Sequence, residues 1–244
     1  MRRRNAKVEG PRVDPRPYGA RPQPEKVWSD VDAYFQSKLL APDAALENAL
    51  AASAQGGLPA IAVTPLQGKF LQLLARSAAA RRILEIGTLG GYSTIWLAHA
   101  LPSGGKLITL EISDAHADVA RKNLAAAGVA DRVDVLVAPA ADSLAKMIRE
   151  GASPFDFIFI DADKASSTAY FRASLALSRA GTMIVVDNVV REGAVADDAT
   201  RDASALGIRE LADYLATEAR VSATAVQTVG DKGYDGFILA VVNP

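Results

Sequence analysis

The sequence predicts an α/β protein with a doubly wound, mostly parallel seven-stranded sheet, and three observations support this prediction. Five short runs of apolar and β-branched residues recur between Ile83 and Val186, with segments of helical length between them. The runs are apolar almost throughout, as in parallel strands that helices cover on both faces. Two later runs flank a glycine-containing turn and predict an antiparallel pair at one edge of the sheet.

The first 26 residues differ in composition from the rest of the chain. They are rich in arginine and proline and contain few apolar residues. Closely spaced prolines prevent a regular helix, and so few apolar groups cannot offset the entropy lost on ordering. Residues 1–26 are therefore predicted to form a flexible tail and residues 27–244 a single domain. The alternative is an arm that docks on a partner subunit or an anionic ligand.

Residues 27–80 are predicted to form helices that precede the sheet. Apolar residues recur at helical spacing from Val27 to about Ala54, and Ala41-Pro42 divides this stretch into two helices. Thr64-Pro65 begins a third helix that runs to Ser77, because proline is favoured just inside a helix start and threonine just before it.

Residues 81–244 are predicted to form the sheet and the helices that cover it. The strands are expected at 83–86, 107–110, 133–137, 157–160, 183–186, 223–228 and 237–242, and the helices between them at 93–100, 115–127, 143–150 and 167–179. Ligands of a doubly wound sheet bind beyond the carboxyl ends of its strands. Functional residues are therefore expected directly after the strands.

The composition excludes several classes of function. The chain has 244 residues, a formal net charge of −1 and no cysteine. A nearly neutral chain has no general attraction to nucleic acids or anionic membranes, and a chain without cysteine has no disulfide, thiolate–metal site or cysteine nucleophile. The sequence has no apolar run long enough to span a membrane and no apolar segment typical of a secretory signal. We expect a cytoplasmic protein with neither a nucleic-acid nor a membrane partner.

A glycine loop follows the first strand, in the sequence Glu85-Ile-Gly-Thr-Leu-Gly-Gly-Tyr-Ser93. Glycines let the backbone approach a ligand closely, and the next helix offers free N–H groups to an anion. The loop differs from a dinucleotide fingerprint because Leu89 occupies the position of the second glycine. The second strand ends in Glu111, whose carboxylate can accept both hydroxyls of a ribose. The alternative for Glu111 is an acidic cap on the helix that begins near Asp114.

Oxygen-bearing side chains follow the fourth and fifth strands. The fourth strand leads into Asp161-Ala-Asp-Lys164, and the fifth leads into Asp187-Asn188. These strands are expected to be neighbours, so Asp161, Asp187 and Asn188 should converge. Two carboxylates and an amide oxygen suit Mg²⁺ or Ca²⁺. The alternative is that each residue caps a helix or a turn.

Together these residues resemble the cation-dependent O-methyltransferases, a group of class I S-adenosylmethionine (SAM) enzymes that contains the catechol and caffeoyl-CoA O-methyltransferases. The resemblance runs from about Val63 to Val242 through T-P-L-Q-G-K-F-L, E-I-G-T-L-G-G-Y-S-T, D-A-D-K and D-N, in that order. It implies a Rossmann-like methyltransferase fold, SAM as co-substrate, a divalent cation with Mg²⁺ as the first candidate, and a homodimer.

The resemblance also assigns roles to particular residues. It implies that Lys164 and Asp161 are catalytic and that Asp161, Asp187 and Asn188 hold the metal. The residues that it places around the cofactor are Val63, Glu85, Gly87, Thr88, Gly91, Tyr92, Ser93, Glu111, Ala140 and Asp161.

The predicted function is cation-assisted transfer of a methyl group from SAM to a hydroxyl of a small molecule with vicinal hydroxyls, such as a catechol. The alternatives are a nicotinamide-dependent reductase on a Rossmann-like fold and a metal-independent methyltransferase. Leu89, in place of the second glycine of a dinucleotide fingerprint, counts against the reductase. His99 and His116 are expected to be surface or packing residues remote from the strand ends.

Overall fold

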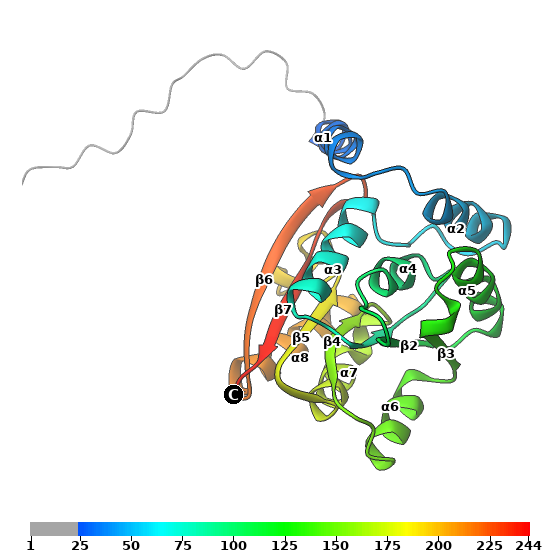
Figure 1. Ribbon diagram of the computed structural model, residues 1–244. Coiled ribbons are helices and arrows are strands. Elements are labelled where there is room, and N and C mark those ends of the chain that lie inside the picture. Colours follow the sequence, from blue (N-terminus) through cyan, green and yellow to red (C-terminus); the bar gives the residue numbers. More distant parts are fainter. Residues whose placement is uncertain (1–23) are drawn as a thin grey trace, which may run out of the picture.

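The computed structural model describes residues 24–244 and has a seven-stranded sheet at its centre, with strand order β3-β2-β1-β4-β5-β7-β6 (Figure 1). Strands β1 to β5 pair in parallel, whereas β7 runs antiparallel to both β5 and β6. This arrangement confirms the predicted doubly wound sheet and its antiparallel edge. The strands are β1 (Arg82–Ile86), β2 (Lys106–Glu111), β3 (Val133–Val137), β4 (Phe155–Ile160), β5 (Ser178–Asp187), β6 (Val221–Gly230) and β7 (Gly233–Val242).

Helices cover both faces of the sheet. The α-helices are α1 (Pro24–Leu39), α2 (Ala44–Gln55), α3 (Pro65–Ser77), α4 (Tyr92–Ala98), α5 (Asp114–Ala126), α6 (Ala140–Arg149), α7 (Ser167–Ala176) and α8 (Ala203–Thr217). Three short 3-10 segments are η1 (Ala130–Arg132), η2 (Lys164–Ser166) and η3 (Arg191–Ala196). Within residues 24–244, no helix combines the length and apolar character needed to cross a membrane.

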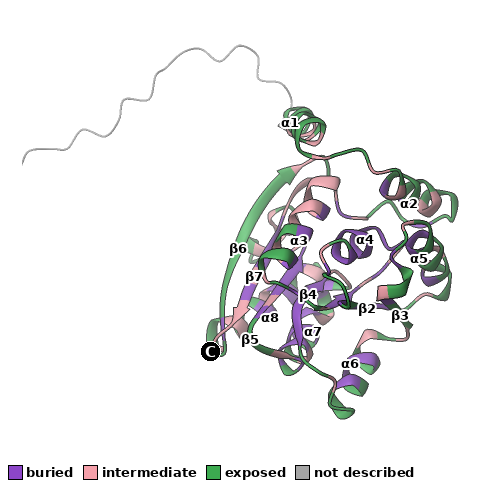
Figure 2. Ribbon diagram, viewed as in Figure 1, coloured by how far each residue is buried: buried purple, intermediate pink, exposed green. Residues whose placement is uncertain are grey.

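The core consists of two hydrophobic clusters, one on each face of the sheet. Successive side chains of a strand point to opposite faces. Phe157 and Phe159 of β4 therefore join one cluster with α2, α3, α4 and α5. Ile158 and Ile160 join the other with α6, α7 and α8. As Figure 2 shows, β4 is buried, whereas β6 is largely exposed at the sheet edge. Burial on both faces explains why the central strands read as continuous apolar runs.

Several predicted boundaries differ from the structure. Helix α1 begins at Pro24, so the last three residues of the predicted tail, Pro24 to Lys26, lie in its first turn. Proline is compatible with a first turn because its missing N–H would have had no helical partner there. The rest of the predicted tail, residues 1–23, lies outside the described residues.

Helix α7 and strand β5 divide residues 167–187 differently from the prediction. The helix predicted to reach Arg179 ends at Ala176, and β5 begins at Ser178. Pairing with β4 explains this, because Ser178 faces Phe155 in the sheet and the Phe155 N–H donates to the Leu177 carbonyl.

Helix α8 was not predicted. Asp202 caps its first turn by accepting the Ser204 N–H at 3.0 Å, and its buried residues include Ile208 and Leu211. This capping aspartate and the helical spacing of the apolar residues are the sequence signals that could have revealed it.

Candidate active site

A cavity of about 1420 Å³ lies beyond the carboxyl ends of the central strands. The glycine loop after β1, the ends of β2, β4 and β5, residues 59–63 and the β6–β7 turn all contribute to its wall. This is the expected ligand site of a doubly wound sheet. The predicted site residues that line the cavity are Val63, Gly87, Thr88, Tyr92, Ser93, Glu111, Ala140, Asp161, Lys164, Asp187 and Asn188.

Glu85 lies beneath the cavity wall and not on it. Its carboxylate is fully buried and accepts hydroxyl hydrogen bonds from Ser93 at 2.6 Å, Thr94 at 2.5 Å and Thr109 at 2.7 Å. Burial raises the pKa of the Glu85 carboxyl to about 7, although the three hydroxyls oppose this shift. The structure therefore gives Glu85 a supporting position under the glycine loop, where the resemblance implied direct contact with the cofactor.

Two glycines give the loop its path. Gly87 has φ +102°, and a Cβ at this position would lie 2.0 Å from the carbonyl oxygen of Asp161. Gly91 has φ +80° and occupies the N-cap position of α4. Like Glu85, Gly91 does not line the cavity, because it supplies the turn that leads the chain into α4.

Glu111 joins the first two loops of the site. Its Oε2 accepts the Leu89 N–H at 2.8 Å, and its Oε1 accepts the N–H groups of Ile112 and Ser113 at 3.0 Å each. The N-cap of α5 is Ser113, so Glu111 does not have the capping role considered as an alternative. Its carboxylate stays on the cavity wall, at the position suited to ribose hydroxyls.

His116 corrects the expectation that both histidines lie far from the site. It lines the cavity, and its Nδ1 lies 3.4 Å from Oε1 of Glu111. The histidine falls in the first turn of α5, which begins three residues after Glu111. His99 is exposed at the end of α4 and does not line the cavity.

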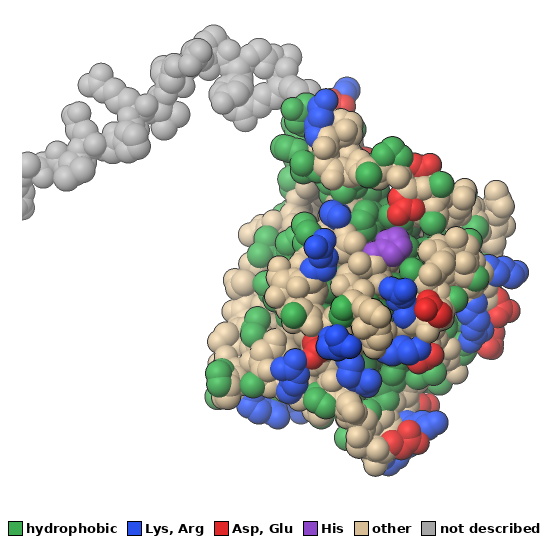
Figure 3. All heavy atoms as spheres, viewed as in Figure 1, with side chains coloured by type: hydrophobic (Ala, Val, Ile, Leu, Met, Phe, Trp, Pro, Cys, Tyr) green, Lys and Arg blue, Asp and Glu red, His purple; other side chains and the backbone are tan. Residues whose placement is uncertain are grey.

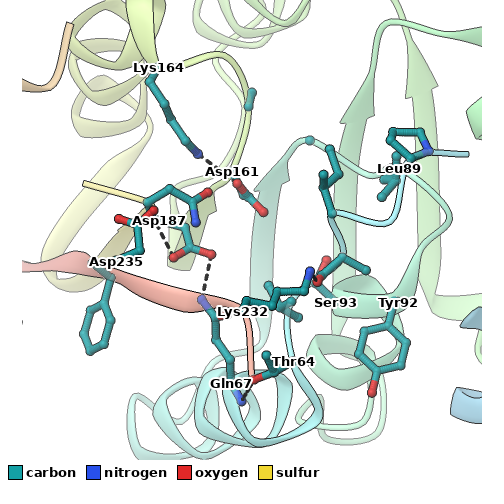
Figure 4. A pocket seen from close by; sticks show the side chains of 18 of the residues that line it. Thr64, Gln67, Leu89, Tyr92, Ser93, Asp161, Lys164, Asp187, Lys232 and Asp235 are labelled. Atoms are coloured by element: carbon teal, nitrogen blue, oxygen red, sulfur yellow. Dashed lines mark hydrogen bonds and ion pairs between the residues drawn. The ribbon is translucent and has the colours of Figure 1, made fainter. Parts of the chain in front are cut away.

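The carboxylates of Asp161 and Asp187 lie close together at the ends of β4 and β5 (Figure 4). The Lys164 ammonium donates to Oδ1 of Asp161 at 2.8 Å and is almost completely buried. Asp187 is buried, and its Oδ2 accepts the Gln67 side-chain amide at 2.6 Å. Burial and then the charge of Asp161 raise the pKa of the Asp187 carboxyl.

The donor set fits a divalent cation that prefers oxygen. A second charge buried beside Asp161 is unfavourable unless a positive group compensates it. Asn188 lines the same cavity and adopts a left-handed conformation, with φ +54°, which asparagine tolerates better than most residues. Within residues 24–244, no group of three or more His, Cys, Asp or Glu side chains could hold a metal. A cation at this place would therefore need the Asn188 amide oxygen as its third protein ligand.

Three cavity residues that were not predicted also contribute to the site. Gln67 belongs to the segment T-P-L-Q-G-K-F-L but reaches Asp187 only through the folding of α3 onto the strand ends. Lys232 comes from the β6–β7 turn, where the sequence predicts a turn but assigns no role to this lysine. Tyr170 donates to Asp163 at 2.6 Å, which fixes the segment between β4 and α7.

Comparisons with known proteins show the family of the chain. The chain matches the O-methyltransferase family over residues 39–240. It is 51% identical to a catechol O-methyltransferase of Mycobacterium tuberculosis, with 87% of this chain and 95% of the relative aligned. It is 49% identical to a catechol O-methyltransferase of Niastella koreensis, with 89% and 98% aligned.

Solved structures show the same fold with a cofactor or its product bound. The O-methyltransferase from Bacillus cereus in complex with SAH is 55% identical, with a TM-score of 0.88 and coverage of 90% of this chain and 100% of that one. The O-methyltransferase TomG from Streptomyces achromogenes, involved in tomaymycin synthesis and solved with SAM, is 49% identical, with a TM-score of 0.88 and coverage of 91% and 100%.

Proposed function

This chain belongs to the O-methyltransferase family and uses SAM, and we propose that it methylates a hydroxyl of a catechol-like small molecule with the help of a divalent cation. Membership of the family confirms the predicted enzyme class and sets the reductase alternative aside. The observation that carries the proposal is the convergence of Asp161, Asp187 and Asn188 on the wall of one cavity. The catechol O-methyltransferase names of two relatives about half identical to this chain support the choice of acceptor.

We assign SAM to the part of the cavity formed by the glycine loop and the end of β2. Glu111 supplies a carboxylate for the ribose hydroxyls, and the start of α4 at Tyr92 and Ser93 offers backbone N–H groups to the methionine carboxylate. Glu85 and Gly91 support this loop from outside the cavity. The remaining residues assigned to SAM are Val63, Gly87, Thr88, Ala140 and Asp161.

We assign the acceptor to the side of the cavity that contains Asp161, Asp187 and Asn188. A free phenol has a pKa of about 10 and is a weak nucleophile near neutral pH. A divalent cation, when bound by these three residues, lowers the pKa of an acceptor hydroxyl. Lys164 lies beside Asp161 and serves the deprotonation either as the proton acceptor or as a fixed positive charge next to the oxyanion.

The methyl transfer itself requires mainly correct placement. The acceptor oxygen forms a bond to the methyl carbon as the carbon–sulfur bond breaks, and the sulfonium becomes a neutral thioether. The chain's contribution is to hold the oxygen in line with the methyl group at near-attack distance. The glycine loop lines one side of the cavity and the Asp161–Asp187 pair lines the other, so the cavity can hold both SAM and the acceptor.

The first experiment measures methyl transfer from labelled SAM to a panel of catechols, with Mg²⁺ and then with EDTA. We expect turnover that EDTA abolishes and that Asp161→Ala also abolishes. Calorimetric titration with Mg²⁺ gives a second measurement that does not depend on turnover, and the Asp161→Ala variant should bind the cation at least tenfold more weakly. Turnover that survives EDTA would contradict the metal role of Asp161, Asp187 and Asn188 and favour a metal-independent methyltransferase.

We also propose that the enzyme is a homodimer formed through α1 and β6. Exposed apolar side chains of α1 recur at helical spacing, and hydrophobic side chains reach the surface near α1 in Figure 3. They are Val27, Val31, Tyr34, Phe35 and Leu39. Strand β6 pairs only with β7 in the described part of the chain, and it carries neither charge nor proline. An uncharged edge strand of ten residues is suited to pairing with a second copy across a two-fold axis.

Light scattering tests the dimer. The wild type should have twice the mass of one chain, and Phe35→Glu should shift the enzyme toward the monomer. A monomeric wild type at micromolar concentration would contradict the proposal. A cytoplasmic location stays a prediction.

A further inference from the structure

The turn between β6 and β7 is fixed to α1. The Asp231 N–H donates to Oδ2 of Asp32 at 2.8 Å, and Asp32 itself lines the cavity. Gly233 has φ +89°, and a Cβ on Gly230 would lie 2.6 Å from the same Asp32 oxygen. The turn therefore follows a path that glycine permits and that brings its residues to the cavity.

The other end of the turn is fixed to the segment that follows the acid pair. Oδ1 of Asp235 accepts the N–H groups of Val190 at 2.9 Å and Arg191 at 3.0 Å, and also that of Gly236 at 2.9 Å. These bonds connect the start of β7 to the residues just after Asn188. The turn and the proposed cation site consequently form one connected structure.

Lys232 extends from this turn across the cavity. Figure 4 shows its side chain between the Asp161–Asp187 pair and Ser93, and its ammonium donates to the carbonyl oxygen of Ala62. The negative charges of Asp161 and Asp187 act on the ammonium, but within residues 24–244 no carboxylate forms an ion pair with it. Its positive charge is therefore held beside the acid pair by a neutral carbonyl alone.

The two lysines of the cavity differ in their partners. Lys164 forms a buried ion pair with Asp161, whose carboxylate neutralises the charge of the ammonium. Lys232 has no such partner and could exchange its bond to Ala62 for a bond to a ligand at little electrostatic cost. Burial lowers the pKa of Lys232, but the charges of Asp161, Asp187 and Asp231 oppose this shift and favour the ammonium.

We propose that Lys232 is a second catalytic lysine, whose ammonium contacts the reacting oxygen of the acceptor and stabilises the negative charge that forms there. The inference rests on the proposed function, because it needs an acceptor hydroxyl beside the acid pair. The hydroxyl proton leaves for solvent, and Lys232 keeps its own proton throughout. Lys232 is exposed as a residue, but the Ala62 carbonyl holds its ammonium in place, and a cation at a fixed position stabilises such a developing charge more strongly than mobile water does.

The test compares Lys232→Met, which removes the charge but keeps the length, with Lys232→Arg, which keeps the charge. Lys122→Met is the matched control, because Lys122 is an exposed lysine of α5 that does not line the cavity. The acceptor is the catechol that the wild type methylates fastest. The measurements are kcat and KM, the pH profile of kcat, and the affinity for S-adenosylhomocysteine by calorimetry.

We expect Lys232→Met to lower kcat by about 100-fold, which is typical for the loss of one group that stabilises a developing anion. The rising limb of its pH profile should shift to higher pH, because a bound hydroxyl without a cation beside it ionises less readily. Lys232→Arg should retain kcat within about tenfold of the wild type. Affinity for S-adenosylhomocysteine should stay within threefold in both variants, and Lys122→Met should match the wild type throughout.

Two results would overturn the inference while leaving the proposed function intact. One is an active wild type with Lys232→Met and Lys122→Met equally active. The other is a Lys232→Met enzyme that loses S-adenosylhomocysteine affinity but keeps both kcat and its pH profile. A wild type that methylates no catechol would contradict the proposed function itself, and the inference with it.

Discussion

Gly87 lies where the glycine loop crosses the end of β4, with its Cα against the Asp161 backbone. We predict that Gly87→Ala lowers the free energy of unfolding by about 2–5 kcal/mol, because a left-handed alanine costs about 1–2 kcal/mol and overpacking adds about 1–3 kcal/mol. The added Cβ would lie 2.0 Å from the Asp161 carbonyl oxygen, so the Asp161 backbone must move. Urea denaturation measures the stability, and methyl transfer should fall as well.

A matched glycine separates the two causes. Gly151 has φ +64°, but a Cβ there would meet no atom within 4 Å. Gly151→Ala should therefore show only the conformational cost of about 1–2 kcal/mol. Equal losses in the two variants would show that contact with Asp161 does not determine the effect at Gly87.

A substitution of Lys164 tests the proposed deprotonation of the acceptor hydroxyl. We predict that Lys164→Ala lowers kcat by about 10²-fold, because it removes the group assigned to deprotonation. Affinity for S-adenosylhomocysteine should change by less than threefold, since Lys164 contacts Asp161 on the acceptor side of the cavity. Steady-state kinetics and calorimetry measure both quantities, with the exposed Lys146→Ala as control. Unchanged turnover would remove Lys164 from the mechanism.

At the scale of elements, the segment after Asn188 is strained and is held in place by β7. Arg191 and Glu192 both have φ +55°, and Gly193 has φ +91°. Non-glycine residues rarely adopt this conformation, which persists only where surrounding contacts impose it. Here the contacts are the bonds from the Val190 and Arg191 amides to Asp235. Residues of β7 therefore determine the path of the chain just beyond the proposed cation site.

We predict that Asp235→Ala destabilises the enzyme by about 2–4 kcal/mol, because hydrogen bonds to a charged group contribute about 1.5–3 kcal/mol each and some of the freed amides gain water. Thermal and urea denaturation test this prediction. Asp213→Ala is the control, since Asp213 is exposed on α8 and should change stability by less than about 0.5 kcal/mol. A loss at Asp235 no larger than in this control would show that the bonds to Asp235 do not hold the segment.

Helix α8 also positions the site from a distance. A Cβ on Gly207 would lie 2.3 Å from the Lys164 carbonyl oxygen, so α8 packs directly against η2. The backbone of Lys164 is thus supported by a helix that begins 39 residues later in the chain. The D-A-D-K motif contains Lys164, but packing of α8 against η2 helps to fix the position of its backbone.

For the molecule as a whole, the two hydrophobic clusters pack helices on both faces of the sheet and leave Glu85 of β1 fully buried against α4. The raised pKa of Glu85, about 7 against an ordinary value of 4.5, links this burial to global stability. Between these two values the folded protein binds a proton that the unfolded chain releases, so the contribution of Glu85 to stability falls as pH rises. It is fully present below about pH 4.5 and lost above about pH 7.

We predict that Glu85→Gln removes this pH dependence. The wild type should lose on the order of 3 kcal/mol more than the variant between pH 4.5 and pH 8, because each unit of pKa shift corresponds to about 1.4 kcal/mol. Urea denaturation at a series of pH values in the presence of EDTA measures the difference. If the free energies of unfolding of the wild type and the variant change equally with pH across this range, the burial of a protonated Glu85 is contradicted.

Local patterns in the amino-acid sequence were enough to predict the layered architecture and most of the candidate site. Apolar runs of strand length, the glycine loop and the polar residues directly after strands are local patterns. In a parallel sheet the carboxyl ends of the strands lie at one edge, so residues that directly follow the strands lie close together. Asp161, Asp187 and Asn188 could therefore be predicted to converge. The cap of α3 at Thr64 was equally local, since it depends on the residues beside it.

Long-range packing, in contrast, determines which distant residues join the site and which of them are buried. Gln67 reaches Asp187 across 120 residues, and Lys232 reaches Ala62 across 170. Neither contact has a local pattern, because each depends on how a helix or a turn packs against the completed sheet. Glu85 was expected beside the cofactor, but three hydroxyls and complete burial place it beneath the loop. Burial and long-range contact belong to the assembled fold, and they determine the charge and the partners of each side chain.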